Sequence, residues 1–243
     1  KSKSLIDFDI SLKSNNWTRN NFENIPHLQS LKFVGSLNSD IRIKGNRDSF
    51  TFKSEIDLTQ AAYKFQDVIH KQENNSNKIE LEGTYSKNKG ITLDQFKFIL
   101  DSNSFTGTGN IKNLSDPKYL IKFNGIGFES NTIGPLMDIF SNNVGGKIDF
   151  NVLGEGNLNK LEDSVFKGSV ILKDLIFKWE DRENPLTLSA NVRISGDTYD
   201  LSSGRMESGR SKILFRGKYK NEKQPELLLK LTGETLIVDE FIS

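Results

Sequence analysis

The residues best suited to proton transfer or metal binding are two histidines, His27 and His70. Each stands alone, and the chain has no cysteine that could complete a metal site. Aspartates and glutamates are numerous, but they alternate with apolar residues, as charged side chains do on the wet face of a strand. Two carboxylates that meet only in the folded chain are left open by the sequence. We therefore expect a protein that is not an enzyme and holds no cofactor or metal.

Two glycine triplets, Gly107-Thr108-Gly109 and Gly154-Glu155-Gly156, resemble parts of phosphate-binding loops. Neither opens a helix after a strand, which a dinucleotide site or a P-loop requires. We expect these glycines to relieve crowding inside a curved sheet instead.

The composition excludes some classes of partner. Lys and Arg number 33 and Asp and Glu 32, interspersed along the chain, so the electrostatic basis for nucleic-acid binding is missing. Only 35% of the residues are hydrophobic, which favours an elongated, surface-rich shape. The 17 phenylalanines outnumber 5 tyrosines and 2 tryptophans, so an apolar surface of this chain suits a dry core or an acyl chain better than a carbohydrate.

The elements that must position these side chains have a period of two. Ile6, Phe8, Ile10 and Leu12 alternate with polar residues, and the same alternation recurs along the chain between turn-forming clusters such as "GNRD" and "SKNKG". This predicts an all-β, mainly antiparallel fold with one or two short helices. The main helix candidate is "SNTIGPLMDIFSNN", and the stretch from 66 to 77 is expected to be a loop.

Two stretches repeat one apolar pattern: "SEIDLTQAAYKF" at 54–65 and "GSVILKDLIFKW" at 168–179. Further along the chain, glycines and prolines recur at an offset of 108 residues, as in Pro117 and Pro225. The sequence therefore predicts two copies of one β unit that share one continuous sheet. The predicted parts are an N-terminal strand with an irregular or helical entry segment (1–34), repeat unit 1 (35–130), a short amphipathic helix or hinge (131–145) and repeat unit 2 (146–243).

A sheet with one apolar face must have that face covered. A second sheet would give a sandwich or barrel with a closed core, whereas a partly closed curved sheet would leave a hydrophobic groove for a lipid tail. Repetition favours the groove, because added units lengthen it. The candidate groove-lining residues are Ile41, Ile43, Phe50, Phe52, Phe96, Phe98, Phe105, Ile121, Phe123, Phe150, Val152 and Leu229. Affinity is expected to follow acyl-chain length and to depend little on the head group.

The segments "IPHLQSLKFVGSLNSDIRIKG", "FTFKSEIDLTQAAYKF" and "GITLDQFKFILDSNSFTGTGNI" resemble the repeating β region of the AsmA-like proteins of the bacterial envelope, relatives of TamB. The DLT-x-A-A core at Asp57 to Ala62 looks most like the large members of that group. The resemblance covers about Ile25 to Phe241. The family often has Lys-Pro after that core, where this chain has "HKQ".

The resemblance implies a taco-like hydrophobic β groove in the periplasm, anchored in the inner membrane by a segment absent from this sequence. It implies a conduit for phospholipid between the two membranes, binding acyl chains and serving outer-membrane lipid homeostasis, with a possible outer-membrane or periplasmic protein partner. Because the sequence opens on Lys1, we expect it to be a piece of a longer protein. The alternative is a non-catalytic structural or protein-binding β module with a closed hydrophobic core.

Overall fold

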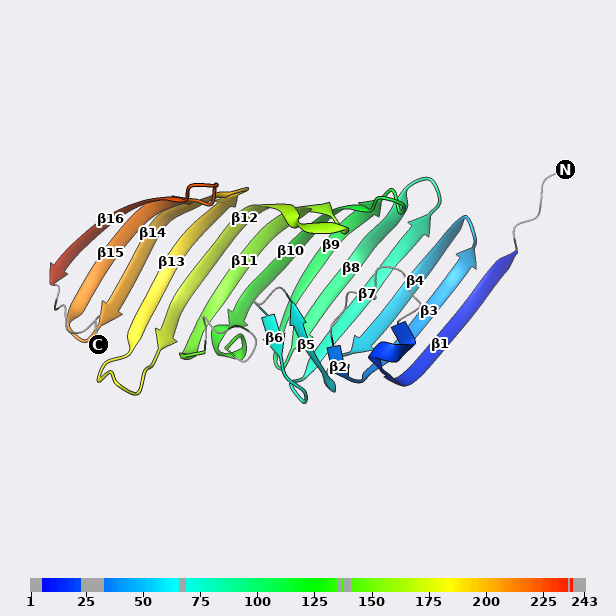
Figure 1. Ribbon diagram of the computed structural model, residues 1–243, viewed down its shortest axis with the longest axis horizontal. Coiled ribbons are helices and arrows are strands. Elements are labelled where there is room, and N and C mark those ends of the chain that lie inside the picture. Colours follow the sequence, from blue (N-terminus) through cyan, green and yellow to red (C-terminus); the bar gives the residue numbers. More distant parts are fainter. Residues whose placement is uncertain are drawn as a thin grey trace. The chain divides into compact units, whose positions relative to one another are not determined.

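The computed structural model describes residues 6–22, 33–65, 69–134, 137, 141–235 and 237. The predicted all-β, antiparallel fold is confirmed, with a 13-stranded sheet and very little helix (Figure 1). The N-terminal elements are β1 (Asp7–Trp17), the 3-10 helix η1 (Arg19–Phe22), β2 (Phe33–Gly35), β3 (Leu37–Asn46), β4 (Ser49–Asp57), β5 (Ala61–Phe65), β6 (Ile69–Lys71), β7 (Asn77–Ser86), β8 (Gly90–Leu100) and β9 (Asn103–Lys112).

The C-terminal elements are β10 (Lys118–Glu129), the 3-10 helix η2 (Ser130–Thr132), β11 (Asn143–Asn157), β12 (Lys160–Phe177), β13 (Leu186–Ser195), β14 (Thr198–Ser208), β15 (Ser211–Lys220) and β16 (Glu226–Thr235). The hydrogen-bonded order of the 13-stranded sheet is β1-β3-β4-β7-β8-β9-β10-β11-β12-β13-β14-β15-β16. Apart from the excursion into β2, β5 and β6, each strand lies beside its neighbour in sequence, as expected for a meander built from short turns.

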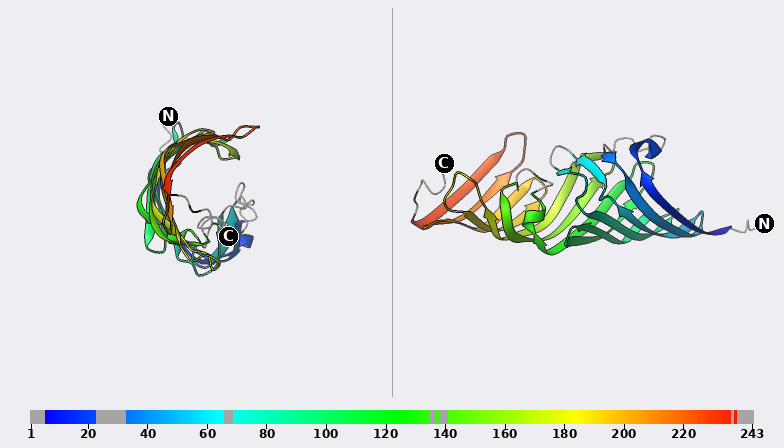
Figure 2. Two further views of the ribbon diagram at one scale, coloured as in Figure 1. Left: turned by 90° about the vertical axis from the view of Figure 1, so that its left-hand side faces the viewer. Right: turned by 90° about the horizontal axis from the view of Figure 1, so that it is seen from below.

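The chain divides into two compact units, and the division runs through β10, β11 and β12. Unit 1 contains Lys1–Lys122 and Glu155–Ser164, and unit 2 contains Phe123–Gly154 and Val165–Ser243. In unit 1 the strands bend, giving the sheet a concave and a convex face, and a second sheet of order β2-β5-β6 lies on the concave side (Figure 2). We call this second sheet the flap. Its strand β6 includes residues 69–71, so the prediction of a loop over the whole stretch 66–77 was wrong.

Strand starts recur along the chain. Strands β8, β9 and β10 begin at residues 90, 103 and 118, whereas β14, β15 and β16 begin at 198, 211 and 226, a constant offset of 108 residues. A β-bulge recurs at the same offset, between Leu93 and Phe96 in β8 and between Leu201 and Gly204 in β14. The boundaries of the two sequence repeats stay a prediction, since the compact units are divided elsewhere.

Residues 135, 136 and 138–140, in the middle of the amphipathic helix predicted over 131–145, lie outside the described residues, and 143–145 already belong to β11. The described part begins with η2, and the Met137 amide donates to the Ile133 carbonyl at 2.9 Å, which is the spacing of one α-helical turn. Of the N-terminal entry segment, β1 and η1 are described, while residues 23–32 are not.

Glycines stand opposite large aromatic rings on neighbouring strands. Gly83 of β7 pairs with Phe52 of β4, and Gly204 of β14 pairs with Phe215 of β15. A Cβ added at Gly204 would overlap the Phe215 ring, and one added at Gly83 would lie 2.8 Å from the Phe52 ring. These glycines therefore leave room for the ring of the adjacent strand to lie flat on the sheet.

We expect Gly204→Ala to lower the free energy of unfolding by about 1 to 3 kcal/mol, because the Phe215 ring must leave its position. Gly145→Ala is the matched control in the same unit, since its added Cβ would meet only the Ile176 Cδ1 at 3.8 Å, an ordinary contact. Urea unfolding monitored by circular dichroism measures both. Equal midpoints for the two variants would contradict the packing role of Gly204.

Candidate functional site

One face of the unit 1 sheet is apolar across six neighbouring strands. Residues that pair across antiparallel strands project to the same face, so the register defines rows of side chains. Each row crosses β1, β3, β4, β7, β8 and β9 in that order. The first two rows are Phe8, Gly45, Phe50, Tyr85, Ile91 and Ile111, and Ile10, Ile43, Phe52, Gly83, Leu93 and Gly109. The next two rows are Leu12, Ile41, Ser54, Leu81, Phe96 and Gly107, and Ser14, Ser39, Ile56, Ile79, Phe98 and Phe105. We call this surface the apolar face of unit 1.

Aromatic rings contact one another along this face. The Phe50 ring stacks on Tyr85 at a centroid distance of 4.7 Å and lies 6.1 Å from Phe8. In a second group, Phe105 lies 5.0 Å from Phe98 and 5.8 Å from Phe96. The phenylalanine side chains of the face are half-buried, while Ile10 and Leu12 at its edge strand β1 are 41% and 54% exposed. The face is thus packed within itself and still open to a ligand.

The flap lies over one end of the apolar face of unit 1. The Tyr63 hydroxyl of β5 donates to Asn77 Oδ1 at 3.0 Å, and Asn77 pairs with Leu100 next to the last apolar row. Both Asn77 and Leu100 are almost fully buried. The flap is on the concave side (Figure 2), so the apolar face of unit 1 is the concave face. The other end of the face, at Phe50 and Tyr85, lies away from the flap.

A buried lysine holds the flap together. The Lys71 ammonium donates to the carbonyls of Ala61, Thr59 and Gln72 at 2.6, 3.1 and 2.9 Å, and its side chain is 2% exposed. Burial lowers the pKa of Lys71, and the nearby carboxylates, including Asp57, oppose this shift. The three carbonyls satisfy the ammonium completely, which makes Lys71 a structural group.

Unit 2 repeats the one-sided pattern. Its rows include Val170, Val192, Leu201, Gly217 and Leu229, and Leu172, Ala190, Gly204, Phe215 and Leu231. On the edge strand β16, Leu227, Leu229 and Leu231 of this face are 69%, 46% and 59% exposed. We call this surface the apolar face of unit 2. A bulge between Leu172 and Leu175, with Asp174 at a φ of 47°, keeps Leu175 on it.

The twelve residues predicted from the sequence all lie on these two faces. The register puts Ile41, Ile43, Phe50, Phe52, Phe96, Phe98 and Phe105 on the apolar face of unit 1 and Leu229 on that of unit 2. Ile121 is in unit 1 and packs beside Gly109, whereas Phe123 follows it on the same side of β10 within unit 2. Phe150 packs against Gly125 and Val152 against Gly168, both in unit 2. Their role in lipid binding stays a prediction.

Sequence reasoning left out many residues of the same faces. In unit 1 these include Leu12, Ile56, Ile79, Leu81, Tyr85 and Leu93, and in unit 2 Leu172, Leu188, Ile213, Phe215 and Leu231. The alternation within each strand would have found many of them, because an apolar residue at every second position marks the buried side of a strand. For the flap residues Tyr63 and Lys71, the alternation of apolar residues gave no indication of their role.

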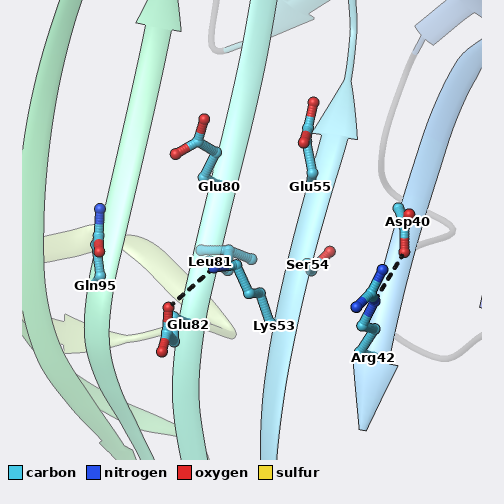
Figure 3. A pocket seen from close by; sticks show the side chains of 9 residues that line it. All are labelled: Asp40, Arg42, Lys53, Ser54, Glu55, Glu80, Leu81, Glu82 and Gln95. Atoms are coloured by element: carbon cyan, nitrogen blue, oxygen red, sulfur yellow. Dashed lines mark ion pairs between the residues drawn. The ribbon is translucent and has the colours of Figure 1, made fainter. Parts of the chain in front are cut away.

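The opposite, convex face of unit 1 is charged. An open depression of about 470 Å³ is lined mainly by Asp40, Arg42, Lys53, Glu55, Glu80, Glu82 and Gln95 (Figure 3). Lys53 pairs with Glu82 at 3.6 Å and Arg42 with Asp40 at 3.9 Å. Exposed pairs of this kind contribute little and leave no activated group. Among the described residues, no group of three histidines, cysteines or carboxylates is placed to hold a metal ion.

In unit 2 the carboxylate with the clearest perturbation is also structural. Hydrogen bonds from Lys173 and from the Gly127 amide lower the pKa of Asp149, so it stays ionised and acts as an acceptor in the sheet. His70 lies in the flap strand β6, and His27 lies outside the described residues. Within the described chain, no helix is long and apolar enough to cross a membrane.

Searches of protein-family models, of curated proteins and of solved structures found no match to this chain. The two apolar faces are therefore the observations from which a function has to be argued.

The Tyr63 hydroxyl offers a test of how the flap is attached. Burial raises the pKa of Tyr63 to about 12, so ionisation is easier in the unfolded chain. The free energy of unfolding therefore keeps its full value below about pH 10, and it falls by up to about 3 kcal/mol as the pH rises to 12, because the unfolded chain ionises first. Tyr63→Phe should unfold about 1 kcal/mol more easily at pH 7, through loss of the bond to Asn77.

Urea unfolding of wild type and Tyr63→Phe at several pH values between about 8 and 11.5 measures this difference. The difference should shrink and then reverse as the pH rises. Tyr219→Phe is the control, because the Tyr219 hydroxyl bonds Asn221 at the exposed end of β15. A constant difference between wild type and Tyr63→Phe across the range would contradict the burial of the Tyr63 hydroxyl against the large sheet.

Proposed function

We propose that this chain is a lipid-binding segment of a protein that carries phospholipid between the two membranes of a bacterial envelope. The observation that carries the proposal is the apolar face of unit 1, where six adjacent strands present phenylalanine, isoleucine and leucine on the concave side while the convex side is charged. A closed hydrophobic core would need a layer that covers the whole apolar face, whereas the flap of three short strands lies over one end of that face. The end away from the flap suits acyl chains, which need apolar contact and no hydrogen-bonding partner.

The cellular setting of the proposal comes from the resemblance to AsmA-like proteins. It places the segment in the periplasm and its anchor in the inner membrane, with an outer-membrane or periplasmic protein as a possible receiver of lipid. The charges on the convex face support a water-filled surrounding, because that side keeps its ion pairs exposed. Binding would rest on shape and apolar contact, without a catalytic step.

A second function has its own supporting observation. Strand β16 ends the order of the large sheet, and its side chains Leu227, Leu228 and Leu231 are more than half exposed. An apolar edge strand recruits partners by strand addition, so β16 would serve a structural or protein-binding module. Lipid uptake separates the two functions, since strand addition needs no bound lipid.

Charged substitutions on the apolar faces test the lipid proposal. The variant Ile10→Asp, Leu12→Asp, Leu229→Asp and Leu231→Asp changes residues that are already 41–59% exposed, so the sheet should tolerate it. It should lower phospholipid uptake about tenfold or more, because each carboxylate must lose water when an acyl chain covers it. Native mass spectrometry after incubation with vesicles measures the lipid that stays bound.

The matched control carries the same four-residue charge change on the other side of the sheet: Leu120→Asp, Ile126→Asp, Leu214→Asp and Leu228→Asp, at positions 37–77% exposed. It should take up lipid as the wild type does. A wild-type chain that stays lipid-free, or an equal loss of lipid uptake in both variants, would contradict the lipid proposal. It would favour strand addition at β16 instead.

Acyl-chain length gives a quantitative check. Each methylene buried against the apolar face contributes up to about 0.8 kcal/mol, so each added methylene should tighten binding by up to roughly fourfold until the face is filled. Calorimetry with phospholipids of increasing chain length should also show a negative heat-capacity change. Affinities that do not change with chain length would contradict acyl-chain burial.

A further inference from the structure

The turns at one end of the unit 1 sheet carry a marked excess of positive charge. Strands β3, β7, β9 and β11 end at this side, and the turns that follow them span 46–49, 86–90, 112–118 and 157–160. We call these four turns the turn rim. It contains six cationic side chains, Arg47, Lys87, Lys89, Lys112, Lys118 and Lys160, against the carboxylates Asp48 and Asp116.

The four turns lie side by side in unit 1. The Lys87 amide donates to the Asp48 carbonyl and the Leu158 amide to the Pro117 carbonyl, each at 2.9 Å. Between these pairs, Gly90 packs so closely that an added Cβ would lie 3.1 Å from the Lys112 Cα. The cationic side chains therefore belong to one continuous strip and not to separate loops.

Most of the positive charge of the turn rim is not neutralised. Asp48 lies 3.8 Å from Arg47 and 3.6 Å from Lys87. Lys89, Lys112, Lys118 and Lys160 are exposed, and they form no ion pair with a carboxylate in the part of the chain that the structure describes. An anion that reached the rim would meet four ammonium groups that no ion pair with a described carboxylate engages.

The turn rim directly borders the end of the apolar face that lies away from the flap. The row Phe8, Phe50, Tyr85, Ile91 and Ile111 lies one residue inside the turns. The next row outward consists of turn residues, because Ser49 pairs with Asn46 and Ser86, and Ser86 pairs with Gly90. Tyr85 stacks on Phe50 and carries a hydroxyl, which suits the boundary between an apolar layer and water. The flap is at the opposite end, where Asp57 and Asp101 surround the satisfied Lys71.

Unit 2 has the same arrangement of strands without the charge excess. Its corresponding turns span 195–198 and 220–226 and contain Lys220 and Lys223 against Asp197, Glu222 and Glu226. Lys220 is also paired with Glu226 at 3.1 Å. Positive charge is therefore a property of the unit 1 rim and not a general feature of turns in this fold.

From this placement we infer that unit 1 orients an anionic phospholipid, with the phosphate head group at the turn rim and the acyl chains on the apolar face. The inference rests on the proposed lipid-binding function and specifies it further. In a phospholipid the charged head group is joined directly to the acyl chains, and here a cationic strip directly borders an apolar face. Affinity then depends on the head group, unlike the expectation from the sequence alone.

The test compares vesicles of phosphatidylglycerol and phosphatidylcholine with identical acyl chains, and counts by native mass spectrometry the lipid retained after the vesicles are removed. Counting retained lipid excludes simple adsorption of vesicles to a basic surface. The turn-rim variant is Lys89→Gln, Lys112→Gln, Lys118→Gln and Lys160→Gln. The control is Lys13→Gln, Lys44→Gln, Lys53→Gln and Lys122→Gln, four exposed lysines on the charged face of unit 1 with the same change in net charge.

Wild type and control should retain phosphatidylglycerol over phosphatidylcholine by roughly fivefold or more, since several exposed lysines each attract an anionic head group. The turn-rim variant should lose this preference and keep its phosphatidylcholine uptake, and about 0.5 M salt should abolish the preference in the wild type. Equal uptake of both lipids by all three proteins, or equal loss in variant and control, would overturn the orientation while leaving lipid binding intact. No uptake of either lipid by the wild type would overturn the proposed function itself.

Discussion

The structure depends on one constraint: neighbouring strands must align most of their apolar side chains on one shared face. A shift of one residue would move a whole strand's apolar set into water. Bulges make this possible where the alternation of the sequence breaks. In β8 the bulge at Asp94 and Gln95 returns Phe96 to the face that carries Leu93, and Ser202 and Ser203 do the same in β14.

Glycine is the second device that the shared face requires. A face that collects large rings on adjacent strands becomes crowded, and the chain relieves the crowding by placing glycine opposite a ring, as at Gly83, Gly125 and Gly204. Each of these glycines has no side chain to bury, and the ring of the neighbouring phenylalanine occupies the space above it on the sheet. The aromatic rings on the faces can therefore pack only because glycines stand opposite them.

The sequence predicted the strands and their faces well, because a period of two is a local property that a few residues reveal. It did not predict the flap. The segments 54–65 and 168–179 have the same apolar pattern, yet the first leaves the sheet after Asp57 and the second continues through a bulge at Asp174. The difference lies in turn chemistry: the Asp57 carboxylate accepts the Thr59 amide and starts a turn, whereas Asp174 bonds Ser189 on the next strand.

The placement of charge also had to come from the structure. The near-equal numbers of basic residues (33 Lys and Arg) and acidic residues (32 Asp and Glu), spread along the chain, do not indicate a basic surface. In the folded chain, charged residues on the strands form ion pairs across the convex face, while charged residues in the turns lie at the ends of the strands. Because the turns that follow β3, β7, β9 and β11 all meet at one end of unit 1, a few lysines from distant parts of the chain become neighbours there. A neutral composition therefore still yields a strongly polarised edge, and that edge borders the apolar face, which no count of residues could reveal.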